Sequence, residues 1–581
     1  MGIFRPVLTS YFQPLEDTLR LTIALLLSGL IAAAQTHQHG PSEAEHIDPA
    51  KLPPPQRIDG IGQAHIPITT KSPQAQQWFD QGLALIHCFW DYEALRAFEE
   101  SIRLDPDCAM CHWGMFQALD FTGEHDLATA ELARAKDLAP KASDREQRYI
   151  RATTEQQDAV HQKKTGDEAM QAFIKEMEAL EERYPDDLQA KLFLASQLID
   201  GYDNKGDPRP GALYGQALLR NLLHDYPSNA AANHYWVHAV EGSGHPEWAL
   251  ESAEKLGKLA PASGHVVHMP GHIFFRLGDY ERARQIFLEA ARVDHDYMDQ
   301  QHVSIRNNWN YSHNLSYLIA DCAEAGRYRE ALDHAAALQG TADDPDQSLN
   351  PGFYILQVGS SAARLDLRFG AWDDAIKQPI NFGVPDEKLS VAARGYRDGM
   401  IAYARGMKAA ESGELSEADR QSDTLDALLW RLSQEKVDDE AKHVRDRVAG
   451  ILETASLDLR GNIAGYRKDL PGMQQLLDKA ADHERDLGYA EPPQYSRPEL
   501  ESLGYALIRA GKFADAREAF HKELHDRPKT GFALYGIALA WDKEGNGPEA
   551  GKAYREFLDA WKGADRDLPQ IRAAEAAISG R

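Results

Sequence analysis

The residues of this chain best suited to chemistry are six histidines and one glutamate, grouped in the stretches NHYWVHAVE, GHVVHMPGH and YSHN. They are His234, His238, His265, His268, His272, His313 and Glu241. Residues four apart on a helix lie on one face, with Cβ atoms roughly 5 to 6 Å apart, so His234 and His238 could chelate one ion. Imidazole nitrogen suits zinc, copper or iron, whereas calcium and magnesium prefer oxygen. The pattern therefore predicts a transition-metal site.

Two other interpretations of the histidine stretches stay open. The side chains could line a polar groove that binds a peptide, or they could form a hydrogen-bond network that only stabilises the fold. If a metal binds, Glu241 would either complete its shell or act as a catalytic base. Pro270 leaves two conformations open for the second stretch. A proline inside the helix would bend it, whereas a helix that begins at Pro270 would leave His265 and His268 in the preceding loop.

A second motif with chemical potential is Cys108-Ala-Met-Cys111-His112. The pattern C-x-x-C-H is typical of c-type haem attachment, in which two thioether bonds hold the haem and the histidine ligates its iron. The same residues could instead form a disulfide or redox-active pair, or be ordinary buried residues. Of the two candidate cofactors, a transition-metal ion and haem c, the sequence favours the transition-metal ion.

The elements that must position these residues are helical repeats. The segment WFDQGLALIHCFWDYEALRAFEESIRLDP places Trp78, Gly82, Ala94 and Phe98 at the fourth, eighth, twentieth and twenty-fourth positions of a unit of 34 residues. Those offsets resemble the packing positions of the tetratricopeptide repeat (TPR). The same frame returns along the chain and predicts an all-α solenoid of helical hairpins, a right-handed superhelix with about ten to eleven repeats and several insertions.

Resemblance to the TPR class implies where the histidines lie. In such repeats the first helix of each pair lines a concave wall, with its second, fifth, ninth and twelfth positions pointing inward. The three histidine stretches would then lie on three consecutive first helices and face one groove. That groove would also contain Tyr311, Asn314 and Arg276, and it could hold a protein or peptide ligand.

Longer segments extend the resemblance over nearly all of the chain after its N-terminal leader. ANHYWVHAVEGSGHPEWAL, SGHVVHMPGHIFFRLGDYERA, YSHN and YAEPPQYSRPELESLGYALIRAGKFADA are similar to a family of exported bacterial TPR proteins with histidine-rich blocks. That family has no agreed biochemical activity. The resemblance therefore supports the fold and singles out the same histidines, but it names no reaction, and whether the protein is an enzyme stays open.

The N-terminus predicts export. The apolar run LTIALLLSGLIAAA ends in small residues, so residues 1–34 are expected to be a signal peptide, with no permanent membrane span after cleavage. Residues 35–72 are polar and contain prolines, which is typical of a flexible linker. We expect a first TPR array at 73–345, carrying the histidines, and a second, continuous array at 346–581. The protein would be periplasmic or secreted.

Charge and missing motifs narrow the function classes. A net charge of -27 would repel phosphate, so no nucleic-acid partner is expected. The chain has no phosphate-binding glycine loop, no G-x-S-x-G elbow and no dinucleotide fingerprint. The sequence thus favours a groove that binds a metal, and it leaves open whether the groove is catalytic. The first alternative is a metal-free interaction scaffold, and the second is a c-type haem protein.

Overall fold

The computed structural model describes residues 47–580 apart from 200, 204–205, 342–350, 378–379, 381, 383–384, 386–388, 438 and 491. Regular structure in this part of the chain is helical, and one isolated antiparallel bridge joins Tyr202 to Pro208. None of the described helices combines the length and apolar character needed to cross a membrane. The predicted signal peptide, residues 1–34, lies outside the described residues.

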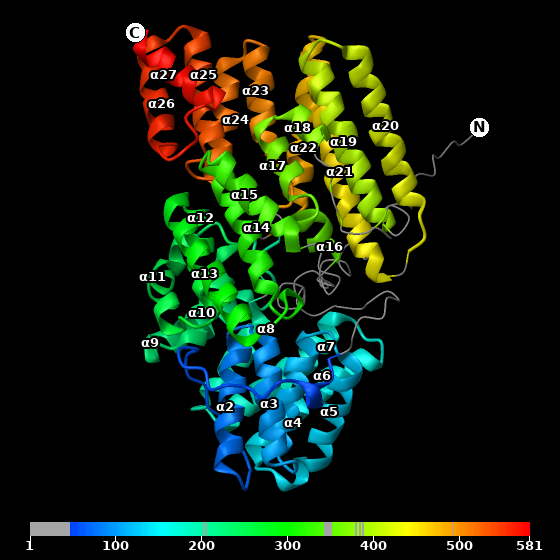
Figure 1. Cartoon of the computed structure of the whole chain (residues 1–581), viewed down its shortest axis with the longest axis vertical. Helices are drawn as coiled ribbons and strands as arrows, with labels where there is room; N and C mark the ends of the chain where they lie inside the picture. The colour runs from blue at the N-terminus through cyan, green and yellow to red at the C-terminus, as the bar shows by residue number, and fades with distance from the viewer. Residues whose placement is uncertain are drawn as a thin grey trace, which may run out of the picture.

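The N-terminal half is a series of helices that pack in chain order as antiparallel pairs (Figure 1). These helices are α2 (Pro73–His87), α3 (Asp91–Leu104), α4 (Ala109–Phe121), α5 (His125–Leu138), α6 (Asp144–His161), α7 (Gly166–Arg183), α8 (Leu188–Leu198), α9 (Ala212–Asp225), α10 (Ala230–Glu241), α11 (Leu250–Leu259), α12 (Gly264–Arg276), α13 (Tyr280–Gln301), α14 (Trp309–Glu324) and α15 (Tyr328–Gly340).

The C-terminal half continues the same arrangement with some longer helices. These are α16 (Pro351–Phe353), the π-helical segment Tyr354–Val358, α17 (Ser361–Phe369), α18 (Trp372–Lys377), α19 (Val391–Glu411), α20 (Leu415–Gln434), α21 (Asp439–Tyr466), α22 (Leu470–Asp486), α23 (Glu499–Arg509), α24 (Phe513–Asp526), α25 (Gly531–Glu544), α26 (Gly547–Ala560) and α27 (Pro569–Ser579). The predicted all-α solenoid of helical hairpins is confirmed.

A buried phenylalanine in some of the hairpins explains why glycine recurs at their helix crossings. Phe98 of α3 is fully buried between Gly82 of α2 and Gly114 of α4, and a Cβ at either glycine would lie 2.7 or 2.3 Å from its ring. Phe287 of α13 occupies the equivalent place beside Gly271 of α12. The ring needs the space that a missing side chain leaves, so the repeat signature in the sequence is a record of this packing.

We expect Gly271→Ala to destabilise the protein by about 1–3 kcal/mol, because a Cβ there would lie 2.3 Å from Cε1 of Phe287 in a filled core. Gly257→Ala in α11 is the matched control. The nearest atom outside its own helix would be Cα of Val267 at 4.0 Å, so the better helix former should stabilise by up to about 1 kcal/mol. Urea unfolding followed by circular dichroism measures both, and shifts of equal sign would contradict this packing.

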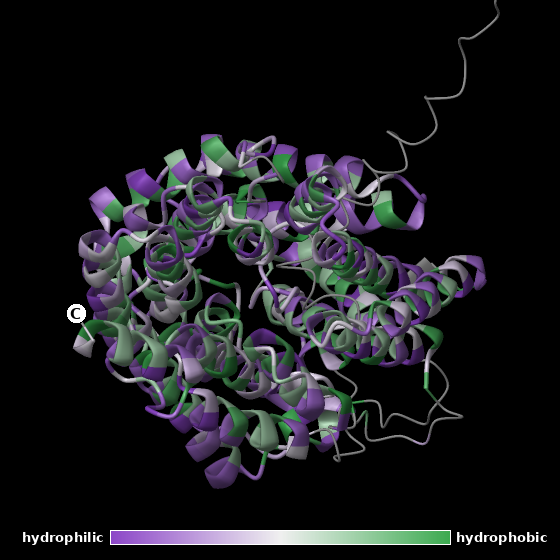
Figure 2. Ribbon diagram, turned by 90° about the horizontal axis from the view of Figure 1, so that it is seen from above, coloured by the Kyte–Doolittle hydropathy of each residue, from purple (hydrophilic) through white to green (hydrophobic). Residues whose placement is uncertain are grey.

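The solenoid closes on itself, because its last repeats pack against its middle. The Tyr280 hydroxyl donates to the carbonyl oxygen of Pro528 at 3.0 Å, and Trp561 Nε1 donates to that of Glu324 at 2.8 Å. Figure 1 shows α24 to α27 directly above α12 and α15, and Figure 2 shows the helices curving around a common axis. The repeats that carry the histidines are therefore packed between the N-terminal repeats and the C-terminal repeats.

The segment expected to be a flexible linker, 35–72, is described from Ile47 onward, and there it is packed on the repeats. Ile66 is buried, and the Thr69 hydroxyl donates to Glu146 at 2.6 Å. Thr70 donates to Asp105 at 2.6 Å in the same way. For residues 47–72 the linker prediction is therefore wrong, because polar side chains of the repeats satisfy this extended backbone. Residues 35–46 lie outside the described part.

Candidate metal centre

Three consecutive first helices, α10, α12 and α14, bring the predicted histidines together. Their ligating nitrogens form two triads, and within each triad all three atoms lie within 4.8 Å of one another. The first triad is His234, His238 and His265, and the second is His268, His272 and His313. Pro270 lies inside α12, whose N-cap is Ser263, so all three histidines of that stretch are helical.

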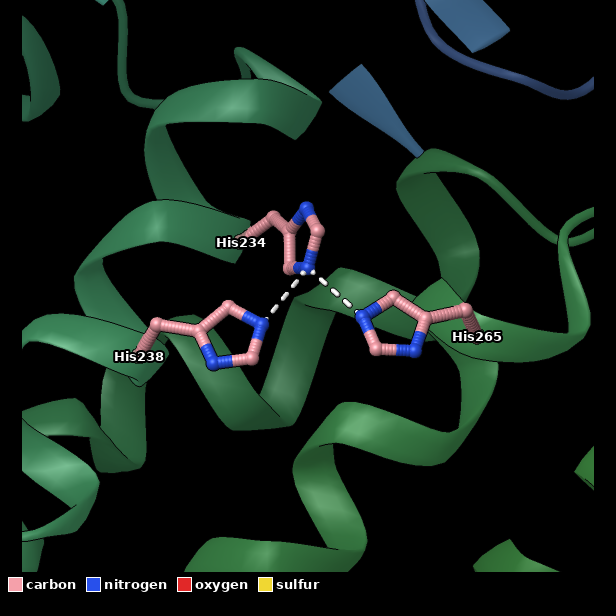
Figure 3. A group of neighbouring side chains, drawn as sticks. All are labelled: His234, His238 and His265. Atoms are coloured by element: carbon pink, nitrogen blue, oxygen red, sulfur yellow. Dashed lines mark hydrogen bonds between the residues drawn. The ribbon is translucent and has the colours of Figure 1, made fainter. Parts of the chain in front are cut away.

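The first triad is built around Nε2 of His234 (Figure 3). This atom lies 3.1 Å from Nε2 of His238, one turn along α10, and 3.1 Å from Nε2 of His265, on α12. The three rings approach from two helices and point the same nitrogen at one place. His234 is fully buried, and His238 is partly exposed.

The other nitrogen of each ring in the first triad faces an oxygen. Nδ1 of His234 lies 2.7 Å from the carbonyl oxygen of His87, and Nδ1 of His238 lies 2.6 Å from Oε1 of Glu241. Nδ1 of His265 lies 3.2 Å from Oδ1 of Asn310. A carbonyl or carboxylate oxygen only accepts, so each neutral ring carries its proton on Nδ1. While all three rings are neutral, each Nε2 is a lone pair, and the three lone pairs face one another.

The second triad has the same plan. Nε2 of His268 lies 2.5 Å from Nε2 of His272, and Nδ1 of His272 lies 2.5 Å from Oε2 of Glu241. His313 of α14 completes the group, with its ring centroid 4.7 Å from that of His268. His272 therefore also carries its proton on Nδ1 and presents a lone pair on Nε2.

Two buried carboxylates hold both triads in place. Glu241 accepts from one histidine of each triad, His238 through Oε1 and His272 through Oε2. Asp294 of α13 accepts from Nδ2 of Asn310 at 2.7 Å and from Nδ2 of Asn314 at 2.6 Å. Asn310 orients His265 of the first triad, whereas Nδ1 of His268 in the second triad has no hydrogen-bond partner among the described residues. Such outer partners fix the ring orientation and tautomer of metal-binding histidines.

Burial disfavours the protonated form of His234, His265, His268 and His313. Desolvation holds the pKa values of His234, His265 and His268 well below the usual range, and it lowers the pKa of His313 to about 3. Desolvation alone would raise the pKa of Glu241, but His238 and His272 beside it hold that pKa well below its usual value. The site therefore combines neutral nitrogen ligands with an anionic orienting carboxylate, which is the protonation state that metal binding requires.

Aromatic side chains enclose the two triads. Phe89, in the loop after α2, lies over the first triad with its ring centroid 4.7 Å from that of His234, and its backbone has a left-handed φ of 53°. Trp309 lies 5.4 Å from His265 and 5.6 Å from His313, so it contacts both triads. The Tyr317 ring lies 4.4 Å from that of His272. Sequence reasoning missed Phe89 and the partners His87, Asn310 and Asp294.

The three residues predicted to line the groove, Arg276, Asn314 and Tyr311, lie in different surroundings. Arg276 donates to the carbonyl oxygens of Glu241 at 2.7 Å and Ser243 at 2.9 Å, so it joins the ends of α10 and α12. Asn314 belongs to the Asp294 network. Tyr311 is half-buried, and its ring lies 6.1 Å from that of His295, which belongs to neither triad.

The C-x-x-C-H motif forms a disulfide. Cys108 and Cys111 are bonded to each other at the start of α4, and both are fully buried. Nδ1 of His112 lies 2.6 Å from Glu131, and its Nε2 lies 3.1 Å from the carbonyl oxygen of Pro106. A haem would need both sulfurs for thioether bonds and an imidazole nitrogen for its iron. The arrangement therefore disfavours the haem alternative for Cys108, Cys111 and His112.

A third group of potential ligands, Cys322, Glu330 and His334, is less suited to a metal. Glu330 is already paired with Arg284 at 2.8 Å, and burial raises the pKa of the Cys322 thiol. A thiol must lose its proton to bind a metal, so this group has neither a free carboxylate nor a ready thiolate.

Comparison with known proteins supports the repeat type. Residues 266–297, within α12 and α13, match the tetratricopeptide repeat family. Similar solved structures include yeast Tom70 (12% identity, 87% of this chain and 96% of that one, TM-score 0.31) and a human IFIT1 dimer with m7Gppp-AAAA (12%, 82% and 95%, 0.34). The TPR domain of P58(IPK) is a third (13%, 68% and 99%, 0.19). No curated protein matches the sequence. The family match thus identifies one tetratricopeptide repeat within the described helical hairpins.

Proposed function

We propose that this TPR protein binds two transition-metal ions, one at each histidine triad. The observation that carries the proposal is the convergence of three Nε2 lone pairs in the first triad, each fixed by an oxygen behind its ring. Lone pairs 3.1 Å apart repel one another unless a cation lies between them. Burial disfavours a proton there, so a metal ion is the cation that best fits the site.

The ligand atoms narrow the choice of metal. Each triad offers nitrogen alone, because the Glu241 carboxylate faces Nδ1 atoms behind the rings. Zinc and copper suit such shells, whereas non-haem iron oxygenases typically add a carboxylate ligand to two histidines. Three protein ligands leave a fourth position open, which is the arrangement of catalytic rather than structural sites. Glu241 then acts as a positioning residue, in contrast to its predicted role as ligand or base.

Export and protein binding remain further proposals. The buried Cys108–Cys111 disulfide supports a periplasmic or secreted location, since disulfides persist in oxidising compartments. The TPR architecture supports a scaffold that holds a protein or peptide segment. A cavity between α14, α17 and the 492–498 segment, lined by Phe275, Arg364 and Tyr495 among others, offers a place for such a segment.

The metal content of tag-free protein tests the proposal. We expect two ions of zinc or copper per chain after purification or reconstitution, one ion in His265→Ala and one in His272→Ala, and none in the double variant. His245→Ala is the matched control, because His245 is exposed and pairs only with Glu247. The proposal would be contradicted by wild-type protein that binds neither zinc nor copper when each is added, while circular dichroism shows that it remains folded.

A further inference from the structure

We propose that the two triads form one dinuclear copper centre whose small-molecule substrate is dioxygen. The inference rests on the proposed metal binding and adds to it the coupling of the sites, the metal and the substrate. Its starting point is that one helix supplies ligands to both triads. Helix α12 supplies His265 to the first triad and His268, less than one turn later, to the second, and the centroids of these two rings lie 6.2 Å apart.

The two sites are also joined through their orienting groups. One Glu241 carboxylate serves His238 and His272, and one Asp294 carboxylate serves the asparagines beside His265 and His268. Independent sites would not need shared partners. A change of charge at one ion is therefore felt at the other, through a buried carboxylate in a medium of low dielectric constant.

The chemistry around the open positions favours electron transfer over hydrolysis. Many hydrolytic zinc sites place a carboxylate base beside the metal-bound water. Here both nearby carboxylates lie behind the rings, bound to Nδ1 atoms or to asparagine amides. The remaining neighbours are the aromatic rings of Phe89, Trp309 and Tyr317. Such an apolar surrounding suits a neutral diatomic molecule, and an all-imidazole shell suits a metal that cycles between Cu(I) and Cu(II).

The reaction step balances with two ions. With one Cu(I) held by each triad, the two ions would together supply two electrons, one from each, for the reduction of dioxygen to the peroxide level. The O–O bond would be kept, no proton would be needed, and dioxygen would be the oxidant. A single copper could give only one electron and would form superoxide, so the step requires both triads.

Electron paramagnetic resonance of protein loaded with Cu(II) alone tests the coupling. We expect wild-type protein with two Cu(II) ions to give a signal several-fold weaker per copper than His272→Ala or His238→Ala with one ion each, because neighbouring spins pair. Two full, independent signals in wild-type protein would overturn the dinuclear centre and leave the proposed metal binding intact. Failure of copper to bind at all would instead contradict the metal binding itself.

Oxygen uptake tests the substrate. Anaerobic protein loaded with Cu(I) should take up one dioxygen per two coppers and develop a peroxide-to-Cu(II) absorption band. The His272→Ala and His238→Ala variants, each loaded with one Cu(I), should show neither. Uptake per copper that is equal in wild-type protein and single-site variants, or release of superoxide by wild-type protein, would overturn the proposal.

Discussion

Replacement of Glu241 by glutamine is expected to weaken metal binding at both triads at once, by about 10- to 100-fold at each. The carboxylate now accepts from Nδ1 of His238 at 2.6 Å and Nδ1 of His272 at 2.5 Å. A glutamine side chain has one accepting oxygen, which is neutral and holds an Nδ1–H less firmly than a carboxylate does, and a donating NH₂ group, which faces the other ring. The other ring would face a donor and would have to move its proton to Nε2, the atom that binds the metal.

Competition with a chromophoric chelator measures the two affinities. Glu247→Gln is the matched control, because its carboxylate pairs with the exposed His245 and should leave both affinities unchanged. Thermal unfolding of the metal-free variants separates a loss of affinity from a loss of structure. A Glu241→Gln protein that keeps one site at full affinity would show that the carboxylate orients a single triad.

The helical positions of the histidines could be predicted because they depend on two local rules. Spacing of four places His234 and His238 on one face of a helix, and the repeat frame places the helices of successive hairpins side by side. His265 and His272 then follow from the same frame. The prediction of helical hairpins succeeded for the same reason, since glycine and phenylalanine at the crossings, such as Gly271 and Phe287, leave a regular signature in the sequence.

The groups behind the rings could not be predicted, because they come from other parts of the superhelix. His87 and Phe89 belong to the first hairpin, far from His234 in sequence, and reach it only through the curvature of the whole array. Asp294 lies on a second helix, α13, whose side chains the repeat frame assigns to the outer layer. The packing of residues 47–72 on the repeats was not predicted either, because it depends on hydrogen bonds between distant residues, such as that from Thr69 to Glu146.

The largest expected effect on stability comes from Arg368 of α17. Its guanidinium group binds Glu324 of α14 at 3.0 Å and Glu501 of α23 at 2.6 Å, and all three side chains are buried. Thr530, at the start of α25, also donates to Glu324, at 2.6 Å. The network thus joins the repeats next to the histidines to the C-terminal repeats that close the solenoid.

We expect Arg368→Met to destabilise the protein by about 3–5 kcal/mol, because it removes the guanidinium group that two buried carboxylates bind directly. Arg329→Met is the control, since Arg329 pairs with Asp567 at the exposed surface and should cost less than about 1 kcal/mol. Urea unfolding measures both variants, and equal shifts would contradict a buried ionic network.

The effect of Arg368→Met should also depend on pH in a defined direction. Burial raises the pKa of Glu501 even beside Arg368, so without the arginine both carboxyls should stay protonated to higher pH in the folded state than in the unfolded chain. A group whose folded pKa is raised favours folding at low pH and loses that advantage as pH rises. The stability gap between wild-type protein and Arg368→Met should therefore widen from pH 5 to pH 8, whereas a gap caused by lost packing alone would stay constant over this range.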